Sequence, residues 1–193
     1  MISGICLFFL KFNYYNLVYN DEFKDYFYIA KKIIMEFKEL VAARHSVRKY
    51  TDKPIERELI DDMIQIALTA PSSKNSKSSG FMIIDDKSTL EAISQMRESG
   101  SSFIADAQAA IVVLGDSDKT DLWVDNASIS ATYLMLAAVE NGLGSCWVHV
   151  NGRVRSKKDP SKGLAEDYLR ELLGIKDNMK ILCVIALGYE AEQ

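Results

Sequence analysis

The chain has few of the residue types on which several classes of functional site depend. It contains only three cysteines, three prolines and two histidines in 193 residues. The cysteines (Cys6, Cys146 and Cys183) are too scattered for a disulfide framework and form no Cys-x-x-Cys pair, which argues against a zinc site. With only His45 and His149 available, a histidine-rich metal centre is excluded. This cysteine usage predicts a reducing, cytoplasmic compartment.

An excess of positive charge is also missing. The 23 Lys and Arg residues are outnumbered by 27 Asp and Glu residues, so the net charge is −4. This balance argues against nucleic-acid binding, because affinity for the phosphate backbone accumulates from Lys and Arg. The apolar stretch 5–10 is too short to span a membrane and ends at Lys11. We therefore expect neither nucleic acid nor membrane as a partner.

No motif for catalysis by side chains is visible. Neither histidine has a Ser–Asp setting, and there is no Walker loop. The pair Gly142-Leu-Gly144 precedes a predicted strand, whereas the glycines of a dinucleotide-binding motif follow one. The carboxylate pairs Asp61-Asp62 and Asp85-Asp86 are expected at helix surfaces or caps. Such a chain suits chemistry that belongs to a bound cofactor.

Aromatic residues are concentrated at the start of the chain. Ten of the 19 aromatic residues fall in the first 28 positions, whereas from Met35 onward the composition is that of a compact domain. We expect residues 1–34 to be an N-terminal extension, with Met35 as the natural start, and residues 35–193 to form one domain. An intact mass of natively expressed protein that includes residues 1–34 would contradict this expectation.

The hydrophobic patterning of the domain predicts helices and strands in a mixed α/β arrangement, with helices covering a sheet. The continuous apolar run 109–115 is typical of a strand buried on both faces. The long helix expected at 123–141 is apolar but carries polar side chains, which indicates a core or subunit-interface helix. Helices are expected at 36–44, 56–69, 88–98, 123–141 and 164–173, and strands at 81–85, 109–115, 145–150 and 179–187.

Two polar stretches are candidates for ligand binding. The stretch 43–50 surrounds one hydroxyl, that of Ser46, with the basic residues Arg44, His45, Arg48 and Lys49. Guanidinium forks and hydroxyls suit a phosphate, although a solvated basic turn after a helix is the alternative. The stretch 70–80 is rich in turn-forming residues between an apolar helix and an apolar strand, which suits a ligand loop or a plain surface connection.

Four motifs, in this order along residues 35–190, resemble the FMN-dependent nitroreductases. Each motif alone is weak, but the four in order on the expected elements are specific. They are Arg44-His-Ser-Val-Arg48, Pro71-Ser-Ser-Lys-Asn75, Gly142-Leu-Gly-Ser-Cys-Trp147 at the close of the long helix, and Gly188-Tyr-Glu190 after the last strand. The resemblance implies an α+β, three-layer sandwich with a mainly antiparallel sheet and a long core helix at the interface of a homodimer.

The resemblance also implies an FMN site at that subunit interface. The residues expected to hold the phosphate and ribityl chain are Arg44, His45, Ser46 and Arg48. Those expected to reach the flavin from the partner subunit are Pro71, Ser72, Ser73 and Asn75. Those expected along the ring near N5, where backbone amides donate to the flavin, are Val148, His149, Asn151 and Gly152. His149 taken alone is more typical of a packed strand residue than of a catalyst.

The implied activity is ping-pong transfer of a hydride from NADH or NADPH through flavin N5 to a nitro-aromatic, quinone or similar small acceptor. The alternative is a flavin-binding or interaction protein of the same fold without efficient turnover. Where the family usually has Gln-Pro-Trp, this chain has Lys77-Ser-Ser79, so local packing or acceptor preference is expected to differ. Family members also continue past the Gly-Tyr segment with basic residues, so the sequence resembles a C-terminally truncated member in which Arg44 and Arg48 carry more of the phosphate.

Overall fold

The computed structural model describes residues 36–192, so the extension expected at residues 1–34 lies outside the described residues. The chain divides into two compact units, Met1–Leu40 and Val41–Gln193, and the helix α3 (Phe37–Ala43) contains the boundary. All other elements described below belong to the second unit.

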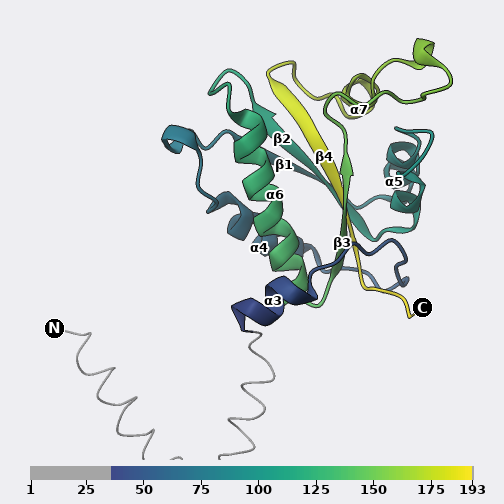
Figure 1. Ribbon diagram of the computed structural model, residues 1–193. Helices are drawn as coiled ribbons and strands as arrows, with labels where there is room; N and C mark the ends of the chain where they lie inside the picture. Colours follow the sequence, from purple (N-terminus) through teal and green to yellow (C-terminus); the bar gives the residue numbers. More distant parts are fainter. Residues whose placement is uncertain (1–35, 193) are drawn as a thin grey trace, which may run out of the picture. The chain divides into compact units, whose positions relative to one another are not determined.

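A four-stranded antiparallel sheet forms the middle of this unit (Figure 1). Its strand order is β1-β2-β4-β3, and each neighbouring pair is antiparallel. The last strand in sequence therefore lies inside the sheet, and β3 lies at one edge. The strands are β1 (Ser79–Ile84), β2 (Ala109–Asp116), β3 (Gly144–His149) and β4 (Met179–Gly188).

Helices cover both faces of the sheet, which confirms the expected three-layer α+β sandwich. The helices α4 (Arg57–Leu68) and α6 (Trp123–Glu140) pack on one face. The helices α5 (Lys87–Ser94) and α7 (Ala165–Leu173) pack on the other face. Three short 3-10 helices complete the described elements: η1 (Ser73–Asn75), η2 (Ser102–Asp106) and η3 (Pro160–Lys162).

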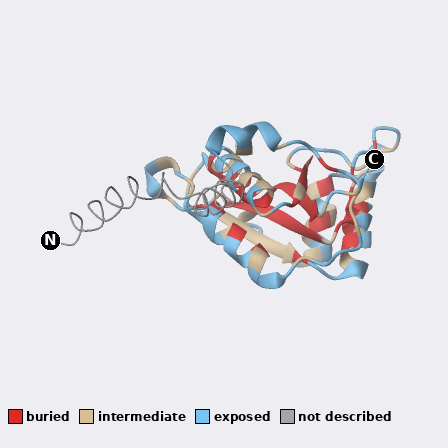
Figure 2. Ribbon diagram, turned by 90° about the horizontal axis from the view of Figure 1, so that it is seen from below, coloured by how far each residue is buried: buried red, intermediate tan, exposed pale blue. Residues whose placement is uncertain are grey.

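The core has two halves because successive side chains of a strand point to opposite faces. In β2, Ala109, Ile111 and Val113 belong to the cluster under α4 and α6. The alternate residues Ala110, Val112 and Leu114 belong to the cluster under α5 and α7. Figure 2 shows the buried residues inside and the exposed ones on the outer surfaces of the helices. The prediction of a strand buried on both faces is confirmed.

A β-bulge in the centre of the sheet redirects the end of β3. The register between β2 and β4 shifts at Val113/Leu114, so that Leu182 is the extra residue of β4. The carbonyl oxygen of Leu182 accepts two hydrogen bonds, from the amides of Val150 (3.0 Å) and Asn151 (3.1 Å). The chain leaving β3 is therefore held tightly at the point where it turns.

The helix expected at 88–98 is shorter in the structure. It is α5, which begins one residue earlier, at Lys87, and ends four residues earlier, at Ser94. Asp86 is the cap, and its carboxylate accepts hydrogen bonds from the Thr89 amide and the Ser88 hydroxyl, both at 2.8 Å. These bonds lower the pKa of Asp86. A carboxylate outcompetes a hydroxyl for this position because it also complements the positive end of the helix dipole.

Candidate functional site

The segment Arg44–Tyr50 lies along the outer edge of the sheet. Ser46 and Ser145 form a parallel bridge, and the Val47 amide donates to the Ser145 carbonyl at 3.0 Å. Past this bridge, the segment crosses to the chain that follows β4, where the Thr51 amide donates to Tyr189 O at 2.8 Å. Backbone hydrogen bonds thus hold the basic stretch against the start of β3 and the end of β4.

Two glycines allow this segment to pack closely against the sheet. A Cβ atom at Gly144 would lie 2.7 Å from the side chain of Val47, and one at Gly188 would lie 2.6 Å from the ring of Tyr50. No real Cβ atom tolerates such a distance, so both positions need glycine for close approach. The Tyr50 hydroxyl donates to the Val47 carbonyl at 2.7 Å. Burial of Tyr50 raises its pKa.

The two arginines of the segment carry uncompensated charge. Within residues 36–192, neither Arg44 nor Arg48 forms an ion pair. Arg48 lies over the ring of Phe103, with its guanidinium carbon 5.8 Å from the ring centroid. Beside them, the Ser145 hydroxyl is buried without a hydrogen-bond partner. This end of the β3 edge therefore offers cations for an anionic ligand.

His45, unlike Arg44 and Arg48, contacts a carboxylate among residues 36–192. Its Nδ1 lies 2.9 Å from the Ala43 carbonyl oxygen, and its Nε2 lies 3.1 Å from the carboxylate of Glu190. These acceptors raise the pKa of His45, the Ala43 carbonyl most and Glu190 next. The ring thus ties the segment to the Gly188-Tyr-Glu190 motif. Sequence reasoning quoted that motif but assigned Glu190 no role.

The far end of β3 presents a free amide. In an antiparallel ladder, amides point alternately toward the partner strand and away from it. The Val150 amide donates to β4, so the amide of His149 points to the open edge of the sheet. The Asn151 amide is already bonded to Leu182. Of the predicted stretch, Val148 is buried and Gly152 makes a turn at φ +66°, which leaves His149 as the donor.

The surroundings of the His149 imidazole favour its neutral form. It stacks on Trp147 with ring centroids 6.2 Å apart, and the indole N–H donates to its Nδ1 at 3.4 Å. Burial lowers the pKa of His149, and the positive charges of Arg153 and Arg97 lower it further. Accepting a hydrogen bond at Nδ1 is compatible with the neutral ring alone.

The loop 71–75 is held in place by one buried side chain. Asn126, near the start of α6, accepts a hydrogen bond from the Ser73 amide at 2.8 Å. Its amide group donates to the hydroxyls of Ser76 (3.1 Å) and Ser78 (2.9 Å). In the sequence, Asn126 is one of several polar side chains of the long helix and belongs to no motif. A buried amide on an otherwise apolar helix was the signal that could have identified this anchor.

The same loop has an unusual backbone. Lys74, Asn75 and Lys77 have left-handed φ values of 51°, 53° and 47°. Non-glycine residues in this region carry strain, and such strain concentrates at functional sites. The Ser72 hydroxyl closes the loop by accepting from the Lys77 amide at 3.0 Å, while Pro71 and Asn75 are exposed.

At Lys77-Ser-Ser79, where the sequence departs from the family pattern, the two serine side chains form hydrogen bonds. Ser78 is buried against Asn126, and the hydroxyls of Ser79 and Ser130 lie 2.9 Å apart. The segment at which the family usually has Gln-Pro-Trp thus contributes hydrogen bonds between β1 and α6 in this chain.

The predicted site residues form two separate groups within one chain. The structure places the stretches 44–48 and 148–152 at the same edge of the sheet, along β3. The loop 71–75 lies at the other end of α6 (Figure 1). The 18 residues of α6 span about 27 Å and separate the loop 71–75 from the stretch 44–48.

Within residues 36–192, no helix has the length and apolar character to cross a membrane. Across the same residues, no three His, Cys, Asp or Glu side chains are grouped to hold a metal ion.

Comparisons with known proteins identify the family. A family model described as "Nitroreductase family" matches residues 41–101 and 94–189. A protein of Archaeoglobus fulgidus, provisionally named NADH dehydrogenase/NAD(P)H nitroreductase, is 32% identical over 159 residues, covering 80% of this chain and 86% of its own length. A solved FMN-dependent nitroreductase from Clostridium difficile is 39% identical with a TM-score of 0.74, covering 80% of this chain and 87% of that one.

Proposed function

The chain belongs to the nitroreductase family, and from this premise we propose that it is an FMN-dependent oxidoreductase that uses NADH or NADPH. The observation that carries the proposal is the edge of β3. At its start the segment 44–50 places two arginines that form no ion pair among residues 36–192, and at its end the His149 amide points outward. Ser145 and His149 are four residues apart, or about 13 Å along the strand, which leaves room for an elongated ligand with one anionic end.

The residues present fit FMN at this edge. Arg44, Arg48 and the Ser46 hydroxyl would bind its phosphate, because guanidinium groups and hydroxyls suit a tetrahedral oxyanion. His45 supports the phosphate end indirectly, by holding the segment to Glu190. The His149 amide would donate to the ring.

The chemistry supplied by the bound flavin would be hydride transfer from NADH or NADPH to N5, followed by reduction of a nitro-aromatic, quinone or similar acceptor. The chain's own part is to bind and orient. A fixed amide at His149, aimed where negative charge develops, stabilises that charge without reorganisation. Because the neutral form of His149 is favoured and its Nδ1 accepts from Trp147, its side chain is not set up as a proton donor at Nδ1.

The protein is further proposed to act as a homodimer with the site at the subunit interface. Leu122, Ile129 and Tyr133 are exposed hydrophobic residues along one side of α6. Two copies paired antiparallel through this helix would bring each loop 71–75 to the β3 edge of the partner. Pro71, Ser72, Ser73 and Asn75 would then reach the flavin from the second subunit. Their position at the end of α6 that lies away from Arg44 and Arg48 supports this arrangement.

The test is the colour of the purified protein. The expected result is a yellow protein, or one that becomes yellow on reconstitution with FMN, and anaerobic bleaching by NADH or NADPH. A protein that remains colourless with excess FMN would overturn the proposal. A yellow protein that neither nucleotide bleaches would support the alternative, a flavin-binding protein without turnover. The cytoplasmic location inferred from cysteine usage stays a prediction, which fractionation of native cells tests.

A further inference from the structure

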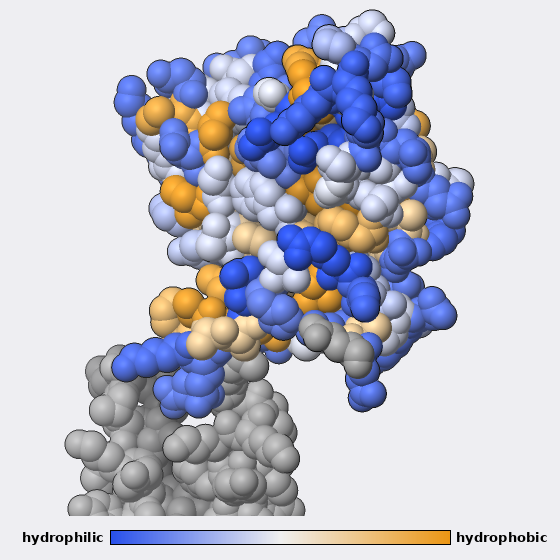
Figure 3. Space-filling view, turned by 45° about the vertical axis from the view of Figure 1, so that its right-hand side comes forward, coloured by the Kyte–Doolittle hydropathy of each residue, from blue (hydrophilic) through white to orange (hydrophobic). Residues whose placement is uncertain are grey.

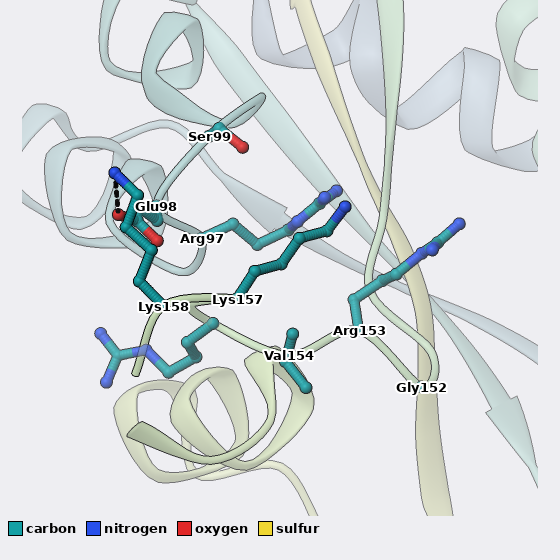
Figure 4. A pocket seen from close by; sticks show the side chains of 9 residues that line it. Arg97, Glu98, Ser99, Gly152, Arg153, Val154, Lys157 and Lys158 are labelled. Carbon is teal, nitrogen blue, oxygen red and sulfur yellow. Dashed lines mark ion pairs between the residues drawn. The ribbon is translucent and has the colours of Figure 1, made fainter. Parts of the chain in front are cut away.

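A basic cavity of about 460 Å³ lies next to the end of β3 (Figure 4). Two chain segments line it, 97–99 after α5 and 152–158 after β3. Figure 3 shows hydrophilic side chains gathered over the upper part of this side of the unit, where the second segment lies in Figure 1. The predicted flavin residues do not account for this cavity, since only Gly152 belongs to both.

The two segments are fastened to each other, so the cavity has defined walls. The Glu98 amide donates to the Arg155 carbonyl at 2.7 Å, and the Ser156 hydroxyl donates to the Glu98 carboxylate at 2.6 Å. The Arg155 guanidinium lies 3.9 Å from the centroid of the Tyr168 ring and donates to the Gln95 carbonyl. Glu98 and Arg155 therefore already have partners within the walls of the cavity.

Three cations of the lining form no ion pair with any residue of the range 36–192. Lys158 forms an ion pair with Glu98 at 3.7 Å. Among the residues that the structure describes, Arg97, Arg153 and Lys157 form no ion pair. Figure 4 shows their three side chains extending in the same direction, away from the Lys158–Glu98 pair. Gathering like charges costs free energy, which an anionic ligand would offset.

The three cations lie on the flavin side of the cavity. Arg153 follows β3 by a tight turn, in which its amide donates to the Val150 carbonyl at 2.9 Å. The charges of Arg153 and Arg97 both reach His149, where they lower the pKa of the imidazole. An anion held by these residues would therefore sit beside the end of the β3 edge at which the ring of FMN is proposed.

We propose that Arg97, Arg153 and Lys157 form a receptor for a phosphate group of the nicotinamide nucleotide that donates the hydride. The proposal rests on the function proposed above, which supplies the flavin and its reductant. Of the two reactants, the nucleotide is the one that needs such a receptor. Nitro-aromatics and quinones are uncharged as a class, whereas NADH carries a pyrophosphate and NADPH an additional 2′-phosphate. Two guanidinium forks and an ammonium group match a phosphate dianion.

The first experiment follows anaerobic reduction of the FMN-loaded protein by NADH and by NADPH in a stopped-flow instrument. Replacing two charges, in Arg153→Ala/Lys157→Ala, is expected to raise the dissociation constant of the donor about tenfold or more and to leave the limiting rate of reduction nearly unchanged. Arg97→Ala is expected to act in the same direction. The matched control is Lys176→Ala, an exposed lysine outside the cavity.

The two donors identify which phosphate is bound. A loss confined to NADPH assigns the receptor to the 2′-phosphate, and an equal loss for both donors assigns it to the pyrophosphate. Unchanged dissociation constants for both donors would overturn the proposal. So would an effect on the acceptor alone, because the cavity would then bind the second reactant.

A second experiment separates this proposal from the proposed function. Isothermal titration calorimetry measures binding of ADP and adenosine 2′,5′-bisphosphate to the full chain, with no turnover needed. Binding of either probe that is weakened in Arg153→Ala/Lys157→Ala supports the receptor. Failure of both probes to bind the unsubstituted chain at low ionic strength would overturn it. A protein that takes up no FMN fails the proposed function in the bleaching test, whatever the calorimetry shows.

Discussion

The two polar stretches of the proposed flavin site are attached to the fold by different means. Arg44–Arg48 is held by its backbone, through the bridge to Ser145, and by glycines that admit its side chains. The loop 71–75 is held through one buried side chain, that of Asn126. The first attachment leaves the arginine side chains free for a ligand. The second makes the loop depend on one residue of α6.

At the β3 edge the side chains proposed to bind the ligand do not hold the segment in place, whereas at the loop one side chain outside the loop holds it in place. At the β3 edge, exchanging an arginine is expected to remove a proposed ligand contact and to leave the segment in place. At the loop, exchanging Asn126 is expected to release the loop 71–75 from its place without altering the loop side chains that are proposed to contact the flavin. Four substitutions or titrations test whether the two stretches differ in this way.

The largest effect is expected at Arg44. The change Arg44→Ala should weaken FMN binding by about 1.5–3 kcal/mol, or roughly 10- to 150-fold, the scale of a charge-assisted hydrogen bond. The melting temperature should change little, because the Arg44 side chain makes no ion pair among residues 36–192. Fluorescence titration with FMN measures the affinity, with Lys49→Ala as the control. An unchanged affinity would mean that the phosphate end lies elsewhere.

The next effect is expected at Asn126, in stability. Asn126→Ala leaves the Ser73 amide and two hydroxyls without their partner, which should cost up to about 3 kcal/mol of unfolding free energy. Urea denaturation measures it. Asn126→Asp keeps the acceptor for the Ser73 amide, so it should lose less. If the alanine variant were as stable as the parent protein, the loop would need a different anchor.

A smaller loss is expected at Gly144. A Cβ atom there would meet Val47 at 2.7 Å, so Gly144→Ala should cost about 1–2 kcal/mol and displace the basic segment. The matched control is Gly80→Ala, where the nearest atom is the flexible end of Met179 at 3.0 Å. Thermal melting together with FMN titration shows both consequences. Loss of stability with full FMN affinity would separate the segment from the site.

The smallest effect concerns the contact between His45 and Glu190. Because the pKa of His45 is raised in the folded protein, the contact stabilises fully below about pH 6.5 and its contribution is lost as pH rises through the raised pKa. The melting temperature should therefore exceed that of Glu190→Gln by more at about pH 6 than at about pH 8.5. A constant difference would contradict the contact.

The two histidines of the chain provide a direct check on the same point. In an NMR titration, one imidazole should titrate above the ordinary histidine pKa and one below it, since His45 is raised and His149 lowered. The Glu190→Gln substitution should bring the higher one down and leave the lower one unmoved. Two coincident titrations would contradict both environments.

The sequence was informative where the signal is local. The buried strand at β2, the long helix α6 and the glycine end of that helix follow from periodicity and turn chemistry, and all are observed. Helix α5 starts one residue before the expected Ser88 because Asp86 provides its cap, and it ends four residues before the expected end at residue 98. The boundaries of the other helices differ from the expected ones by one residue at most.

Contacts between distant segments were beyond the reach of sequence patterns. Asn126 gave no motif, because its partners lie about 50 residues earlier in the chain. The stretch Arg44–Arg48 was visible because its charges are adjacent in sequence. Arg97 and Arg153 are 56 residues apart, and the fold alone brings them to one cavity. Charges that are adjacent in the sequence can be recognised from the sequence alone. Charges that the fold brings together are recognised only in the tertiary structure.

The strand order has a consequence for how the protein is made. Because β4 lies between β2 and β3, the edge strand has no neighbouring strand of the sheet to pair with until residues 179–188 have been synthesised. The bridge from Tyr50 to Glu190 likewise joins an early segment to one of the last to emerge. On the ribosome, β1 and β2 can pair first, and the proposed flavin edge forms only near the end of translation. A nascent chain released before β4 would therefore carry every predicted flavin-binding residue and still have no flavin site.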